Sequence, residues 1–140
     1  GSLNRLRPGA LEGRTLKDAL EKMIREYQTL SNLQVDLHYE WVDVDMDVMI
    51  EDTIFRVIQE SMTNAVRHGH ASQMSLHFFE DEEDYLIELQ DNGVGFETLT
   101  YGYGLKQMME RISILGGQLQ FESRDGFFTR VSLPKYKEGR

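Results

Sequence analysis

Apolar residues recur along the chain with two different spacings, which predict where helices and strands lie. Between Thr15 and Leu30 they fall three or four positions apart, as in an amphipathic helix. From Leu33 to Tyr39 apolar and polar residues alternate, which predicts a half-buried strand. A second helix is expected to begin after a capping aspartate, Asp45 or Asp47, and to stop at Gly69.

The rest of the chain predicts two hairpins separated by one more helix. The expected elements are strands over 74–79 and 85–89, a helix over 105–115 that ends at Gly116-Gly117, and strands over 118–122 and 127–133. The order is therefore helix, strand, helix, two strands, helix, two strands. It predicts that the helices pack on one face of a mostly antiparallel sheet.

Composition narrows the class of protein. The chain has 140 residues, enough for one ordinary domain, and a net charge of −9 that disfavours direct binding to nucleic acid or anionic membrane. There is no cysteine, which excludes disulfides and thiolate metal sites. No apolar run approaches the ~18 residues that a membrane span needs. The acidic run of residues 80–84 lacks the spacing of a calcium loop and is expected to be a solvated turn.

The first residues do not look like a targeting sequence. Gly1-Ser2 resembles the remnant of a cloning site in front of an excised domain, and we assign residues 1–5 to a scar or linker. The domain is expected to cover residues 6–140.

One edge of the second helix carries polar groups suited to phosphate chemistry. Its inward stripe is Ile50, Ile54, Ile58, Ser61 and Ala65. Glu60, Asn64 and Arg67 share a neighbouring stripe, and His68 joins its edge. A carboxylate and an amide oxygen one turn apart suit a hydrated magnesium ion, and the cations can meet phosphate. The alternative is a solvated polar face with helical ion pairs.

The four histidines give little support to a zinc site. His68 and His70 flank the expected helix end, so they need not share a face, and two histidines without further ligands are a weak signal. His38 and His77 lie on expected strands, where we expect them to face solvent or to be hydrogen-bonded.

Two glycine-rich loops follow. In Asp91-Asn92-Gly93-Val94-Gly95 the glycines permit close approach of a ligand, and a carboxylate there can accept a hydrogen bond from an exocyclic amine such as that of adenine. A tight Asp-Asn-Gly turn is the alternative. Gly102-Tyr103-Gly104-Leu105 opens a helix whose free N–H groups can bind an anion, with Lys106 in its first turn; an ordinary turn is the alternative.

The glycine spacing excludes two common nucleotide-binding motifs. Neither loop has the G-x-G-x-x-G spacing of a dinucleotide-binding fold, and no G-x-x-x-x-G-K-S/T P-loop is present. Residues 97–101 connect the two loops and have no evident core role, so we expect them to act as a lid over a ligand.

Taken together, residues 60–68, 91–96 and 102–105 resemble the N, G1 and G2 boxes of the GHKL ATPases. The resemblance is closest to the catalytic ATP-binding domain of bacterial sensor histidine kinases of the nitrate-sensor and desaturase-sensor type. Its specific marks are Thr-Asn-x-x-Arg-His at 63–68, Gly-Leu-x-x-Met-x-Glu-Arg at 104–111 and the short lid. Leu6-Arg7-Pro8 resembles the junction after that subclass's dimerisation helices. The architecture that the resemblance implies is the Bergerat fold, an α/β (α+β) two-layer sandwich in which about three helices cover one face of a mixed, mostly antiparallel sheet.

The resemblance implies roles for the phosphate-binding residues. Asn64 would bind the Mg²⁺ that bridges the ATP phosphates, and Glu60 would act beside it as a polarising or proton-accepting catalytic group. The remaining phosphate-side positions are Arg67, His68, Gly102, Gly104, Leu105 and Lys106.

The resemblance also implies an adenine pocket. Asp91 would accept from the adenine amine, Gly93 and Gly95 would shape the pocket, and Thr129 would support the adenine through Asp91 or a water. Relatives often have glycine just before this threonine, where the present chain has Phe127-Phe128. At this position the chain departs from the pattern of the family.

The implied reaction is transfer of the ATP γ-phosphoryl group to a histidine on a dimerisation domain that is absent from this chain. We therefore expect the chain to bind ATP without phosphorylating itself and to be largely monomeric. The implied parent is a homodimeric, membrane-anchored sensor kinase with this domain in the cytoplasm. Its implied partner is a response regulator with a LuxR-like output domain.

Two other functions remain open at this stage. An anti-sigma-factor serine kinase would share the same boxes, although residues 6–8 and the Met-x-Glu-Arg helix argue against it. A non-catalytic nucleotide-sensing module is the other possibility, and the intact Glu60, Asn64 and Asp91 argue against that.

Overall fold

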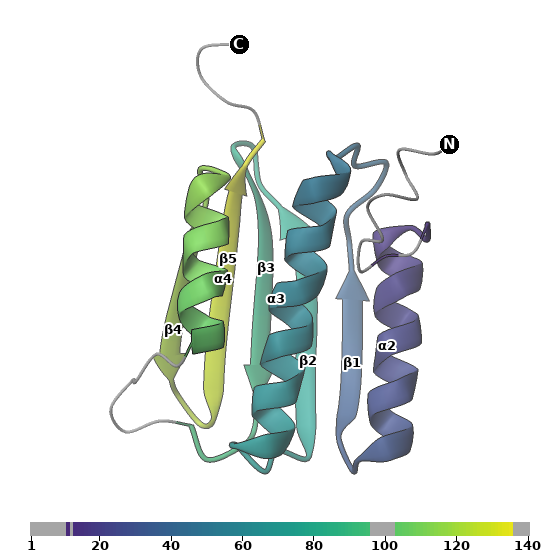
Figure 1. Cartoon of the computed structure of the whole chain (residues 1–140), viewed down its shortest axis with the longest axis vertical. Coiled ribbons are helices and arrows are strands. Elements are labelled where there is room, and N and C mark those ends of the chain that lie inside the picture. Colours follow the sequence, from purple (N-terminus) through teal and green to yellow (C-terminus); the bar gives the residue numbers. More distant parts are fainter. Residues whose placement is uncertain (1–10, 12, 96–102, 136–140) are drawn as a thin grey trace.

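The structure is a computed structural model, and it describes residues 11, 13–95 and 103–135. Within these residues the chain forms three helices and five strands (Figure 1). The helices are α2 (Leu16–Leu30), α3 (Val48–Arg67) and α4 (Tyr103–Ile114). The strands are β1 (Gln34–Tyr39), β2 (Gln73–Glu80), β3 (Asp84–Asp91), β4 (Gln118–Ser123) and β5 (Phe127–Pro134). The predicted order of elements is confirmed.

The strands form one sheet in the order β1-β2-β3-β5-β4. β1 runs parallel to β2, and every other neighbouring pair is antiparallel. A parallel pair needs a long crossover, which α3 supplies between β1 and β2, whereas the antiparallel pairs β2–β3 and β4–β5 close through short turns. The predicted mixed, mostly antiparallel sheet is confirmed.

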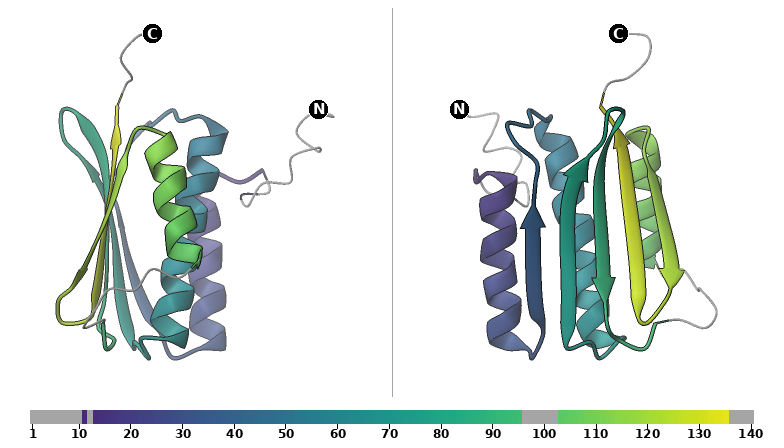
Figure 2. Two further views of the ribbon diagram at one scale, coloured as in Figure 1. Left: turned by 60° about the vertical axis from the view of Figure 1, so that its left-hand side comes forward. Right: turned by 180° about the vertical axis from the view of Figure 1, so that it is seen from behind.

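All three helices lie on one face of the sheet, and the other face is open (Figure 2). The core between the two layers includes fully buried side chains from both, such as Ile58 and Met62 of α3 and Leu76 and Phe78 of β2. Since strand residues alternate between faces, each strand sends its odd or even set toward the helices. The predicted two-layer sandwich is confirmed.

The helix boundaries follow from caps that the sequence contains. The Thr15 hydroxyl accepts from the Asp18 N–H at 3.1 Å. Of the two candidate caps for α3, Asp47 is the one used, because its Oδ1 accepts from the Met49 N–H at 2.7 Å. α4 begins two residues before the predicted start, and Gly116, with a φ of +83°, ends it.

The acidic run is a turn at its centre only. Glu80 and Asp84 belong to β2 and β3, so the prediction that all five residues form a turn was too broad. Glu80 is held at the strand end by an ion pair with Lys135 at 2.6 Å. Asp81 accepts from the N–H groups of Glu83 and Asp84, and these bonds lower the pKa of its carboxyl.

Some predictions fall on parts of the chain outside the described residues: the linker 1–5, the junction at 6–8, the lid at 97–101, and Gly102. Among the described helices, none combines the length and apolar composition that crossing a bilayer requires.

Candidate functional site

The last two turns of α3 carry the predicted phosphate-side residues. Glu60 and Asn64 are half-buried, while Arg67 and His68 are exposed at the end of the helix. Within the described part of the chain, neither Glu60 nor Arg67 forms an ion pair. The alternative of a face of helical ion pairs therefore finds no support at these positions.

Packing and hydrogen bonds on other sides of α3 fix how this edge is presented. Ile58 and Met62 are fully buried against the sheet. Ser61 donates to the Val57 carbonyl at 2.9 Å, and the hydroxyls of Thr63 and Tyr27 are 2.6 Å apart, which links α3 to α2. The polar edge is therefore held in place by the core rather than by its own contacts.

The Glu60 carboxylate lies directly against the start of α4. A Cβ added to Gly104 would overlap the Glu60 carboxylate, so any larger residue would displace one of the two. Leu105, only 5% exposed, anchors this first turn of α4 in the core. The predicted N-box carboxylate and G2-box glycine, far apart in sequence, are thus adjacent in space.

Asp91 is the last residue of β3, and its side chain is almost entirely buried, with 5% exposure. Its Oδ1 accepts from the N–H of Gly93 at 2.8 Å and from the N–H of Phe127 at 3.1 Å. Among the described residues, no partner is recorded for Oδ2. One oxygen is therefore committed to the protein, and the other remains able to accept from a ligand.

The loop after Asp91 packs backbone to backbone against the end of α3. A Cβ on Gly93 would lie 2.5 Å from the Gly69 carbonyl oxygen, and the Val94 N–H donates to that same oxygen at 3.0 Å. Gly95 has a φ of +68°, and a Cβ there would lie 2.6 Å from the Ser123 hydroxyl. Glycine is therefore needed at position 93 for the approach to the end of α3, and at position 95 for the approach to Ser123 and Gly126.

Thr129 lies in the middle of β5, directly opposite Leu89 of β3, and is 1% exposed. Because neighbouring residues alternate between faces, Phe128 points to the open face, where the Arg124 guanidinium lies 3.8 Å from its ring centre. Phe128, where the family resemblance led us to expect glycine, thus leaves Thr129 on the helix-covered face. The adenine contact of Thr129 stays a prediction.

Other candidate residues are less closely connected. Lys106 is exposed in the first turn of α4. His77 is half-buried and lies 3.1 Å from Glu40, and His38 is exposed, as expected for strand histidines. In the described ranges, no group of three or more histidine, aspartate or glutamate side chains could hold a metal ion.

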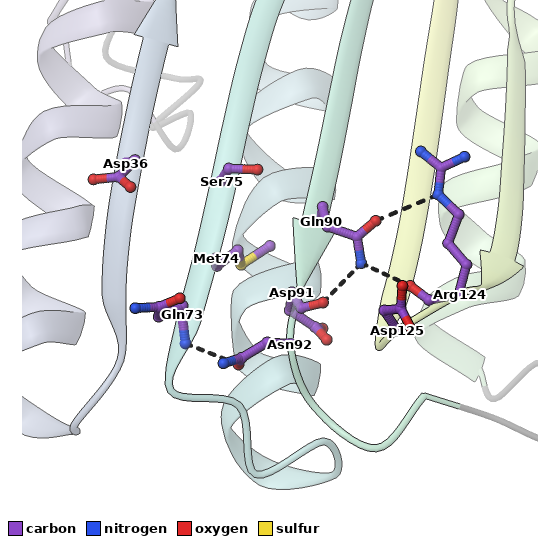
Figure 3. Close-up of a pocket in the computed structure, with 9 residues that line it drawn as sticks. All are labelled: Asp36, Gln73, Met74, Ser75, Gln90, Asp91, Asn92, Arg124 and Asp125. Atoms are coloured by element: carbon purple, nitrogen blue, oxygen red, sulfur yellow. Dashed lines mark hydrogen bonds between the residues drawn. The ribbon is translucent and has the colours of Figure 1, made fainter.

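A hollow of about 380 Å³ lies on the open face of the sheet, behind Asp91 (Figure 3). Ser75, Gln90 and Arg124 are among its lining residues. The hollow faces away from α3 and α4, so it does not include the Glu60 and Asn64 side chains. Asp91 and Asn92 of the predicted G1 box also line the hollow, but it is separate from the phosphate-side residues of α3 and α4.

The sequence reasoning missed three residues that shape the site. Gly69 was read only as a helix stop, although its carbonyl receives the Asp91–Gly95 loop. Gly126 was read as part of a hairpin turn, yet a Cβ there would overlap the main-chain oxygen of Asp91. Gln90 had no signal at all, because an outward-facing glutamine on a strand is ordinary.

Comparison with known proteins identifies the family of the chain. Residues 49–137 match the family described as "Histidine kinase-, DNA gyrase B-, and HSP90-like ATPase". The chain belongs to this family. The match begins in α3 and includes both glycine loops, Asp91 and Thr129.

Two relatives of known name are histidine kinases. The chain is 35% identical over 138 residues to the signal transduction histidine-protein kinase/phosphatase UhpB of Salmonella typhimurium, covering 95% of this chain and 27% of that protein. It is 31% identical over 131 residues to the sensor histidine kinase LiaS of Bacillus subtilis, covering 91% and 36%. The chain thus spans about a quarter to a third of these relatives.

Solved structures share the fold at low sequence identity. The histidine kinase domain of the Erythrobacter litoralis EL346 blue-light activated kinase superposes with a TM-score of 0.72 at 17% identity, covering 85% of this chain and 60% of that one. The Acinetobacter baumannii histidine kinase AdeS gives a TM-score of 0.72 at 19% identity, covering 87% and 64%. The Bergerat fold is confirmed.

Proposed function

We propose that this chain is the ATP-binding catalytic domain of a sensor histidine kinase, which donates the γ-phosphoryl group to a histidine on a separate dimerisation domain. The observation that carries the proposal is the meeting of the motifs. The Glu60 carboxylate touches Gly104 of α4, while the loop after Asp91 packs on the end of α3. These groups converge at one end of the sandwich.

Adenine recognition is assigned to the Asp91 end of the site. Oδ1 is committed to two backbone N–H groups, which orients the carboxylate and leaves Oδ2 to accept from the exocyclic amine of adenine. Guanine presents a carbonyl oxygen at the corresponding position, which a carboxylate would repel. The pocket is therefore expected to prefer ATP to GTP.

Phosphate binding is assigned to α3 and α4. Arg67 and His68 offer donors to phosphate oxygens from the end of α3. The first turn of α4 offers backbone N–H groups, and Gly102, Gly104, Leu105 and Lys106 belong to that region of the chain. In the proposed transfer, the acceptor histidine nitrogen bonds to the γ-phosphorus, the bond to the β,γ-bridging oxygen breaks, and ADP leaves.

The donor set of α3 fits a magnesium ion. Asn64 supplies an amide oxygen and Glu60 a carboxylate one turn away; both are half-buried oxygen donors, which Mg²⁺ prefers alongside water and phosphate. Asn64 would hold the ion, and Glu60 would lie near it. When bound, the ion neutralises phosphate charge. Glu60 is further assigned to polarise the acceptor group or to take up its proton.

The proposal is tested by calorimetric titration of the chain with ATP and GTP, each with and without magnesium. We expect a preference for ATP that Asp91→Ala abolishes. Asp91→Asn retains an oxygen for the Gly93 and Phe127 N–H groups but replaces the second acceptor with a donor, so it too should lose the preference while folding normally. Equal affinity of the unaltered chain for GTP would contradict the pocket assignment.

Phosphotransfer needs a second assay. Incubated with ATP and magnesium, the chain is expected to form no acid-labile phosphohistidine, and addition of the parent's dimerisation helices should produce it there. Phosphoserine on a small partner would support the serine kinase instead. Tight ATP binding without any transfer would support a nucleotide-sensing module.

The context of the whole protein is part of the proposal. We propose a homodimeric parent anchored in a membrane, with this domain at residues 6–140 in the cytoplasm, and a response regulator with a LuxR-like output domain as its partner. The sensor kinase relatives support this context. Co-purification of the full-length protein with its regulator tests it.

A further inference from the structure

The proposed adenine acceptor, Asp91, is held from both faces of the sheet. Its side chain points toward the helices, and its Oδ1 receives two backbone N–H groups there. The preceding residue, Gln90, points to the open face because strand residues alternate. From that side its Nε2 donates to the Asp91 carbonyl oxygen at 2.7 Å (Figure 3).

The same Gln90 amide group also reaches the turn between β4 and β5. Nε2 donates a second hydrogen bond to the Arg124 carbonyl oxygen at 3.2 Å. The Gln90 side chain therefore ties the end of β3 to a turn that is more than thirty residues away in sequence. Gln90 thus links the end of β3 and the β4–β5 turn, the two segments that surround the Asp91 carboxylate.

Arg124 orients this amide. Its Nε donates to Gln90 Oε1 at 3.5 Å, so the other end of the amide, Nε2, faces the two carbonyl oxygens. Its guanidinium is fixed in turn over the Phe128 ring, 3.8 Å from the centre. Through this contact, Phe128 supports the orientation of Arg124 and of the Gln90 amide.

The turn approaches Asp91 so closely that only glycine fits. A Cβ on Gly126 would overlap the Asp91 carbonyl oxygen, and Gly126 has a φ of +127°. This approach brings the Phe127 N–H within 3.1 Å of Asp91 Oδ1. The position of the carboxylate thus depends on the distance between β3 and the turn, which the Gln90 amide bridges.

We propose that Gln90, oriented by Arg124, is a positioning residue for purine recognition: it acts from the open face by holding the β4–β5 turn against Asp91. The proposal rests on the proposed adenine contact of Asp91. Gln90 does not touch the nucleotide, since its side chain lies on the opposite face of the sheet. Its effect is on selectivity between purines rather than on phosphate binding.

The test compares two identical chemical changes in the same hollow. Gln90→Glu keeps the size of the side chain but removes both N–H donors and turns a charged oxygen toward two carbonyls. Gln73→Glu makes the same change at an exposed position on β2 that also lines the hollow and for which no side-chain hydrogen bond is recorded among the described residues. Gln90→Met removes the donors without adding charge.

Titration with ATP and GTP measures the ratio of their dissociation constants, which is the quantity that the proposal concerns. We expect Gln90→Glu and Gln90→Met to weaken ATP binding about three- to tenfold, which is the range for loss of the proposed hydrogen bond between Asp91 and adenine. The preference for ATP over GTP should decrease by a similar factor. Gln73→Glu should stay within about twofold. Circular dichroism must first show that each variant is folded at the titration temperature, because partial unfolding would weaken the apparent binding of ATP and GTP by the same factor.

An independent readout is the pair of amide protons that bind Asp91 Oδ1. In ¹⁵N-resolved spectra, the Gly93 and Phe127 signals should shift in the Gln90 variants and remain in place in Gln73→Glu. Unchanged selectivity and unchanged signals in the Gln90 variants would overturn the inference. If the unaltered chain shows no ATP preference, the proposed role of Asp91 fails; if it does and Asp91→Ala abolishes it, only the role of Gln90 is at stake.

Discussion

The two ends of the sheet are stabilised in different ways. One end of the sheet carries an aromatic cluster of Tyr39, Trp41, Phe78 and Tyr85. The ring centres of its contacting pairs are 4.8 to 5.8 Å apart, and the Trp41 indole N–H donates to the Phe79 carbonyl at 2.6 Å. At the Asp91 end, glycines and backbone hydrogen bonds replace large side chains.

This difference separates stability from recognition. The aromatic end buries apolar area, which is the larger source of folding free energy. The Asp91 end leaves room for a ligand and depends on close backbone approach, which contributes less to stability but defines the geometry of the proposed pocket. Changes at the two ends should therefore have different consequences.

The largest effect is expected from Trp41→Ala, which breaks the aromatic end. Loss of a buried tryptophan side chain and its hydrogen bond should reduce the free energy of unfolding by about 3 to 5 kcal/mol. Urea unfolding followed by circular dichroism measures this. The affinity of the folded fraction for ATP should be unchanged; a parallel loss of affinity would show that the two ends are coupled.

A smaller effect on stability, joined by one on binding, is expected from Gly126→Ala at the Asp91 end. The added methyl group meets the Asp91 main-chain oxygen at a positive φ, so we expect a loss of about 1 to 3 kcal/mol. Gly116→Ala is the matched control, because Gly116 also has a positive φ but only ordinary contact, 3.7 Å to Pro134. Thermal unfolding and ATP titration are measured on both variants. Only Gly126→Ala should weaken ATP binding.

Asn64→Ala should sharpen the comparison by affecting binding alone. We expect it to weaken ATP binding in magnesium about tenfold and to abolish the difference between magnesium and EDTA, as loss of one contact to a charged group predicts. Gln59→Ala removes an exposed amide side chain from another side of the same helix. If both variants retained the magnesium dependence in calorimetry, Asn64 would not be the metal-binding residue.

The smallest effect is expected from Tyr39→Phe and only in alkali. Burial and the nearby Glu51 raise the pKa of Tyr39 to about 12, so the folded state holds this proton more tightly than the unfolded state does. Stability should therefore fall as pH rises from about 10 toward 12, by about 1 kcal/mol after solvent screening. The variant should lose this part of the alkaline decline in unfolding experiments and match the unaltered chain at pH 8.

Local patterns predicted most of the elements and the motif residues. The period of three and four residues marked α2 and α3, and alternation marked β1, because burial of one face imposes these periods. The sequence did not decide between Asp45 and Asp47, because aspartate is a suitable cap at either position. The folded structure decides it, because the helix begins at Val48, directly after Asp47. The extent of the acidic turn was overestimated because Lys135, which pairs with Glu80, lies far away in sequence.

Residue type and spacing were enough to establish the order of the elements and the chemistry available: carboxylate, amide and cation on one helix edge, and glycines in two loops. The contacts between Glu60 and Gly104, between Gly93 and Gly69, and between Gln90 and the β4–β5 turn emerged from the folded molecule. The physical reason is that sheet order and register depend on burial summed over the whole core. No local pattern records which distant backbone will lie against a given glycine or amide.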